Sequence, residues 1–120
     1  MTDVVGKRTL ITGAASGIGK LLAWRLADAG ARLVLWDIDA PGLGELETDL
    51  VAAGHEVDVY TCDLTSRDTI AAVAARTLAD GGPIDILVNN AGIVSGKTLL
   101  DISEQEIERT FQVNTLALFW

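Results

Sequence analysis

The chain has 120 residues, enough for one domain with a substantial core, and 49% of them are hydrophobic, which excludes a disordered chain. A formal net charge of -8 would repel a phosphate backbone, so we expect no nucleic-acid partner. The only cysteine, Cys62, excludes an internal disulfide, has no companion at metal-ligand spacing and indicates a reducing compartment, which favours a cytoplasmic location without a metal site.

The first half of the chain alternates between strand and helix patterns. A strand is expected over 9–12, followed by a helix over 17–29 with Gly30 as its stop signal. A second strand over 32–37 precedes a second helix, which Asp39 would cap. That helix has a leucine at every third or fourth position: Leu43, Leu46 and Leu50.

The next strand and helix repeat this order. A third strand is expected over 56–61, and Thr65, three residues before Asp68, predicts the cap of a third helix. The segment 81–83, Gly-Gly-Pro, would end that helix, and a fourth strand would follow over 84–89.

The last pattern is a helix that begins after a loop over 90–102. Ser103, three residues before Glu106, predicts a capping box at its start. Apolar residues then fall on two stripes, so we expect this helix to run toward the end of the chain and to be buried on both sides. The two stripes are Ile107, Phe111 and Leu118, and Val113, Ala117 and Trp120.

This alternation indicates a parallel sheet with crossover helices, an α/β architecture. Right-handed crossovers and a reversal after the third strand predict the spatial order 3-2-1-4. We therefore expect residues 1–120 to form a single Rossmann-type, doubly wound domain. Trp24 and Trp36 are interpreted as packing residues of its core.

The turn between the first strand and the first helix contains Gly13, Gly17 and Gly19. In this context a glycine-rich turn presents backbone N–H groups to a pyrophosphate. Gly13 would permit a sharp exit from the strand, Gly17 would leave room for the phosphates, and Gly19 would let the helix pack close to the sheet. The alternative is a tight turn with a structural role only.

Asp37 ends the second strand, where its carboxylate can accept hydrogen bonds from an adenosine ribose 2′-hydroxyl. The same charge would repel a 2′-phosphate, and Ser16 before the second glycine has no positive charge to attract one. These residues favour NAD(H) over NADP(H), with Ile18 and Ile38 as further cofactor neighbours. The alternative is that Asp37 only ends the strand.

The turn Thr12–Gly19, together with Asn89-Asn90-Ala91-Gly92 after the fourth strand, resembles the short, non-extended branch of the short-chain dehydrogenase/reductase family. In that family the second motif stabilises the sheet beside the glycine turn, and its backbone borders the cofactor's ribose. The resemblance therefore implies cofactor contacts at Asn90, Ala91 and Gly92. The extended branch usually spaces its glycines as G-x-x-G-x-x-G, unlike this chain.

Two further positions match residues with roles in that family. The resemblance implies that Asp63 accepts a hydrogen bond from the adenine amino group, with Leu64 lining the adenine pocket. It also implies that Asn114 holds a water of the proton relay, which makes Asn114 the candidate catalytic residue. Asn114 falls on an apolar stripe where burial would demand hydrogen-bond partners. A turn carboxylate and a helix kink are the respective alternatives.

The segments 33–38, 60–63 and 107–110, with 113–114 and 119–120, resemble the retinol dehydrogenase and 17-beta-hydroxysteroid dehydrogenase subfamily. The resemblance implies an NAD-dependent oxidoreductase that moves a hydride between nicotinamide and an apolar alcohol or ketone. It further implies a homodimer or homotetramer. No apolar run reaches the ~20 residues that span a bilayer, so we expect no membrane anchor in this chain.

The family's catalytic Tyr-x-x-x-Lys motif does not occur in these residues. The only tyrosine is Tyr60, four residues before Leu64, and no lysine follows Lys97. We therefore expect this portion to seat the cofactor, while catalysis depends on residues beyond Trp120. A nucleotide-binding or interaction module without catalysis is the alternative hypothesis.

Overall fold

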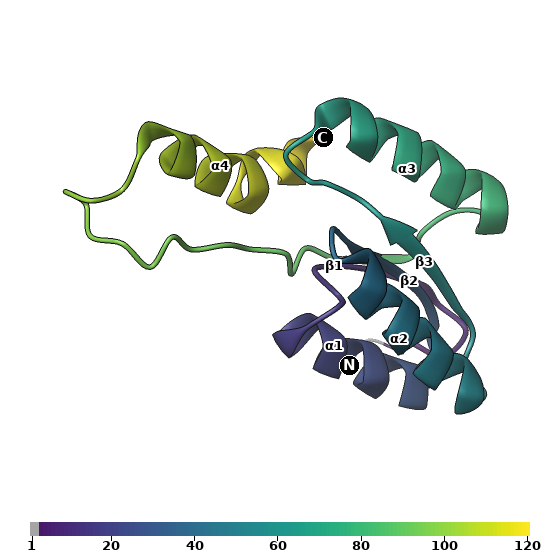
Figure 1. Ribbon diagram of the computed structural model, residues 1–120. Helices are drawn as coiled ribbons and strands as arrows, with labels where there is room; N and C mark the ends of the chain where they lie inside the picture. Colours follow the sequence, from purple (N-terminus) through teal and green to yellow (C-terminus); the bar gives the residue numbers. More distant parts are fainter. Residues whose placement is uncertain (1–2) are drawn as a thin grey trace.

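The computed structural model describes residues 3–120, which form a four-stranded parallel sheet with helices on both faces (Figure 1). The strands are β1 (Arg8–Thr12), β2 (Arg32–Asp37), β3 (Val57–Thr61) and β4 (Ile86–Val88). The helices are α1 (Gly17–Asp28), α2 (Ala40–Ala52), α3 (Arg67–Gly81) and α4 (Glu104–Asn114), followed by the 3-10 helix η1 (Leu116–Phe119). The strand order β3-β2-β1-β4 confirms the predicted order 3-2-1-4.

β1 lies inside the sheet, between β2 and β4, and all five of its residues are buried. Its Ile11 is in register with Leu35 of β2 on one side and with Val88 of β4 on the other. The order reverses after β3, because β4 pairs with β1 on the far side from β2. Ligands bind at such a reversal in open α/β sheets, beyond the carboxyl ends of the strands.

Two apolar cores hold the helices against the sheet. α1 and α2 cover one face, where Leu43, Leu46 and Leu50 are at most 1% exposed (Figure 1). α3 covers the other face, where the indole Nε1 of Trp36 donates a hydrogen bond to Thr77 Oγ1 at 3.2 Å. Trp36 is therefore a core residue, as predicted. In the described part of the chain, no helix has the length and apolarity needed to cross a membrane.

The cap of α3 differs from the sequence prediction, because Ser66 and not Thr65 occupies it. Ser66 Oγ accepts a hydrogen bond from the backbone N–H of Thr69 at 3.2 Å. The hydroxyl and the backbone N–H of Thr65 both donate to Asp63 Oδ1. Since that local turn engages Thr65, the following serine becomes the cap. Asp39 caps α2 as predicted, through a bond from the N–H of Gly42.

β4 is shorter than the predicted strand over 84–89. After Val88, the backbone N–H of Asn90 donates to Thr12 Oγ1 at 3.1 Å, so a side chain replaces the next backbone partner of the ladder. The chain leaves the sheet at this point and passes beside the glycine turn.

The last helix is also shorter than predicted. The expected capping box is present, with hydrogen bonds in both directions between Ser103 and Glu106. However, α4 ends at Asn114, and the predicted burial on both sides is wrong, since Phe111 is 61% exposed. On the other stripe, Val113 is partly buried and Ala117 of η1 packs against the core beneath α3, whereas Trp120 is 47% exposed.

Candidate functional site

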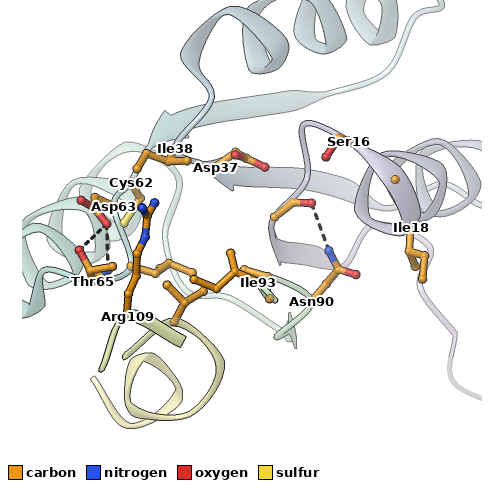
Figure 2. Close-up of a pocket in the computed structure, with 16 residues that line it drawn as sticks. Ser16, Ile18, Asp37, Ile38, Cys62, Asp63, Thr65, Asn90, Ile93 and Arg109 are labelled. Atoms are coloured by element: carbon orange, nitrogen blue, oxygen red, sulfur yellow. Dashed lines mark hydrogen bonds between the residues drawn. The ribbon is translucent and has the colours of Figure 1, made fainter. Parts of the chain in front are cut away.

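A pocket of about 380 Å³ lies at the carboxyl ends of the strands (Figure 2). Its walls come from the turn between β1 and α1, from the segments that follow β2, β3 and β4, and from α4. The lining residues are Gly13, Ser16, Gly17, Ile18, Asp37, Ile38, Cys62, Asp63, Leu64, Thr65, Asn90, Ala91, Gly92, Ile93, Arg109 and Val113. The pocket thus occupies the point where the strand order reverses.

All of the sequence-predicted cofactor residues except Gly19 line this pocket. Gly19 lies behind the turn, packed against the carbonyl of Gly13 and the side-chain amide of Asn90. Asn114 lines a neighbouring apolar hollow with Ile93 and Phe111.

Sequence reasoning missed several lining residues: Cys62, Thr65, Ile93, Arg109 and Val113. Four of them are neighbours in sequence of predicted residues, which is a signal that could have identified them. Arg109 has no such neighbour, and only its spacing of one helical turn from Val113 places the two side chains on one face of α4.

The glycine turn brings the backbone close to the pocket at Gly13 and Gly17. Gly13 and Gly17 have φ values of +68° and +53°, a region that favours glycine. No atom lies within 4 Å of the position that a Cβ would take at Gly17, so its face toward the pocket is open. Gly17 also begins α1, where the first backbone N–H groups and the helix dipole favour an anion. This arrangement fits a pyrophosphate.

Asn90 joins the glycine turn to the end of β4. Its side-chain Nδ2 donates to the carbonyls of Thr12 at 3.0 Å and of Gly13 at 3.1 Å. In return, the Oγ1 of Thr12 accepts from the backbone N–H groups of Asn90 and Ala91. These four hydrogen bonds hold the turn and the segment after β4 as one rigid unit.

Asp37 presents a fixed carboxylate at the end of β2. One oxygen, Oδ2, accepts a hydrogen bond from the N–H of Ala15 at 2.9 Å, and the other accepts from the N–H of Asp39 at 3.0 Å. Each carboxylate oxygen has a second lone pair that a ligand hydroxyl can use. The carboxylate therefore has both the position and the acceptor capacity to bind a sugar hydroxyl.

Asp63 is a second carboxylate in the pocket. The backbone N–H and the hydroxyl of Thr65 both donate to its Oδ1, and these bonds hold the pKa of Asp63 below its ordinary value. The positive charge of Arg109 lowers that pKa further. Beside it, burial raises the pKa of the Cys62 thiol to about 11, so this cysteine is a protonated wall residue rather than a nucleophile.

The prediction that Asn114 is buried is wrong. Its side chain is exposed, and it pairs with the backbone of Ile93 in both directions: Nδ2 donates to the carbonyl and Oδ1 accepts from the N–H, each at 2.8 Å. Asn114 is the last residue of α4 and, with Phe111, lines the open hollow beside Ile93, which explains its exposure. Asn114 therefore joins the end of α4 to the segment that follows β4.

Comparison with known proteins identifies the relatives of this chain. The family model described as short chain dehydrogenase matches residues 7–120. Estradiol 17-beta-dehydrogenase 11 of Homo sapiens is 42% identical over 118 residues, and epidermal retinol dehydrogenase 2 of Homo sapiens is 42% identical over 119 residues. These alignments cover 98% of this chain but 39% and 38% of the two relatives. The chain thus spans about two fifths of their length.

Solved structures of short-chain dehydrogenases superpose closely on this chain. A short-chain dehydrogenase/reductase from Burkholderia phymatum in complex with NAD superposes with a TM-score of 0.92 at 34% identity, covering 99% of this chain and 42% of that one. A metagenomic short-chain oxidoreductase in complex with NADP superposes with a TM-score of 0.89 at 39% identity, covering 98% of this chain and 54% of that one.

Proposed function

The chain belongs to the short-chain dehydrogenase family, and on this premise we propose that it forms the NAD(H)-binding part of an oxidoreductase acting on apolar alcohols and ketones. The observation that supports this most is the Asp37 carboxylate, fixed by two backbone N–H groups in the wall of the pocket. It provides an acceptor for the adenosine ribose and a charge that opposes a 2′-phosphate.

The choice of NAD(H) over NADP(H) depends on Asp37 rather than on the family. Among similar solved proteins, one is in complex with NAD and several are in complex with NADP or NADPH. In this chain Ser16 of the glycine turn is uncharged. Ile38, which follows Asp37, is apolar. Neither residue can pair with a 2′-phosphate as an arginine would.

The remaining pocket residues have separate parts in binding. The open face at Gly17 and the start of α1 would receive the pyrophosphate, and the segment Asn90–Gly92 would border a ribose. Asp63 would accept from the adenine amino group, with Leu64 packing beside it. NAD, when bound, supplies the hydride acceptor for alcohol oxidation.

Asn114 is proposed to contribute to proton transfer by holding a water. Its side chain fixes the segment after β4 through Ile93, so it can couple that segment to α4. The substrate class follows from the relatives, whose names specify retinol and estradiol, both apolar alcohols. We further propose that residues 1–120 form one domain of a cytoplasmic homo-oligomer, in which the exposed Phe111 stripe packs against another surface.

Steady-state oxidation assays test this function. With NAD⁺ as acceptor, the full-length protein that contains these residues is expected to oxidise retinol or 2-decanol with a kcat/KM at least about 10-fold above that for the polyol sorbitol. A preference for sorbitol would contradict the apolar substrate class. NADH binding without turnover of any alcohol would instead favour a non-catalytic binding module.

The gene sequence separates the same two functions independently. If the open reading frame continues past the Trp120 codon, the hypothesis of an enzyme predicts a serine and a Tyr-x-x-x-Lys motif in the residues that follow. A stop codon directly after Trp120 would contradict catalysis by this chain.

A further inference from the structure

Arg109 lines the pocket, and the proposed function gives it no role. It lies on α4, which runs back toward the sheet alongside the long loop that follows β4 (Figure 1). Figure 2 shows its side chain reaching from α4 toward Asp63, while Ile38 approaches from the opposite side. Arg109 and Ile38 therefore border the same end of the pocket.

The charge of Arg109 is unusual in its surroundings. Among the residues that line the pocket, Asp37 and Asp63 are acidic and Arg109 is the one with a positive charge. Its charge reaches Asp63, since it lowers the pKa of that carboxyl. Within residues 3–120, no hydrogen bond or ion pair shorter than 4.0 Å engages the guanidinium, so its flat faces and its donors are free.

We propose that the guanidinium of Arg109 lies against one face of the cofactor's adenine ring, with Ile38 against the other face. This inference rests on the proposed NAD(H) function and adds a residue to its binding site. A planar guanidinium stacks well on aromatic rings, and the nearby Asp63 carboxylate, which would accept from the adenine amino group, orients it. Lysine lacks the planar group and would not replace it.

Equilibrium titrations with NADH and with adenosine test this role. Adenosine is the informative probe, because it has the base and the ribose but no phosphate. Arg109→Ala is expected to weaken both NADH and adenosine by about 5-fold. Arg109→Lys keeps the charge and is expected to recover less than half of the lost binding free energy.

Arg76→Ala is the matched control. It removes the same charge, but Arg76 lies over the ring of Tyr60 and outside the pocket. Its NADH affinity is expected to stay within about 2-fold of wild type.

Two results would overturn the proposal. Unchanged adenosine affinity in Arg109→Ala, even with weaker NADH binding, would assign the arginine to the phosphates rather than to the base. Full recovery of adenosine binding in Arg109→Lys would show that charge alone matters. A wild-type protein that binds neither NADH nor adenosine would instead refute the proposed function, so the two failures are distinguishable.

Discussion

Substitution of Asp37 by alanine is expected to weaken NADH binding by roughly 10- to 100-fold. The range corresponds to the loss of one charge-assisted hydrogen bond to a ribose hydroxyl, or of two such bonds. NADPH binding should fall far less or improve, because the variant no longer opposes a 2′-phosphate. The ratio of NADPH to NADH dissociation constants, measured by fluorescence titration, is therefore expected to approach one.

This result needs a control for charge and one for stability. Asp49→Ala removes the same charge from an exposed position of α2, away from the pocket, and is expected to leave both affinities within about 2-fold. Asp37→Ala also removes the acceptor for the N–H of Ala15, so urea unfolding of the variant must confirm that it is folded under the titration conditions. Unchanged NADH affinity in a folded Asp37→Ala protein would refute the assigned role.

Gly19→Ala is expected to reduce the free energy of unfolding by about 2 kcal/mol, as a net effect. A Cβ at this position would collide with the carbonyl of Gly13 and would lie 2.6 Å from Asn90 Nδ2. The first of these is backbone and the second is fixed by two hydrogen bonds, so α1 itself must move away from β1. Overpacking of this kind costs about 3 kcal/mol, and the better helix propensity of alanine returns about 1 kcal/mol.

Gly44→Ala provides the comparison within the same protein. Gly44 lies inside α2, and nothing lies within 4 Å of the position that its Cβ would take. The same substitution should therefore stabilise the protein by up to about 1 kcal/mol. Urea unfolding of both variants measures the difference. Equal stability changes of the two variants would contradict the close packing described at Gly19.

The sequence predicted the strand order and the location of the pocket because both depend on local signals. Gly30 and Gly54 follow α1 and α2, with φ values of +90° and +89°, and the leucines of α2 keep helical spacing. Once the elements are known, the right-handed crossover rule places the glycine turn at the reversal of the sheet.

The errors came from competition between neighbours and from tertiary contacts. Thr65 and Ser66 are both acceptable caps. Because Thr65 donates its hydrogen bonds to Asp63, Ser66 becomes the cap. Asn114 appeared buried because its stripe is apolar, but α4 has no buried residue and Asn114 lines an open hollow with Phe111. Arg109 gave no local signal, since an arginine on a helix is usually a solvated surface residue. Its position in the pocket follows from the path of the loop that precedes α4.

The most direct test of NAD(H) binding by this chain is an equilibrium titration of the wild-type protein with NADH and with NADPH under the same salt and pH. The fixed carboxylate of Asp37 and the uncharged Ser16 predict that NADH binds at least about 10-fold more tightly. Equal dissociation constants, or tighter binding of NADPH, would contradict the assignment of Asp37 and with it the proposed cofactor.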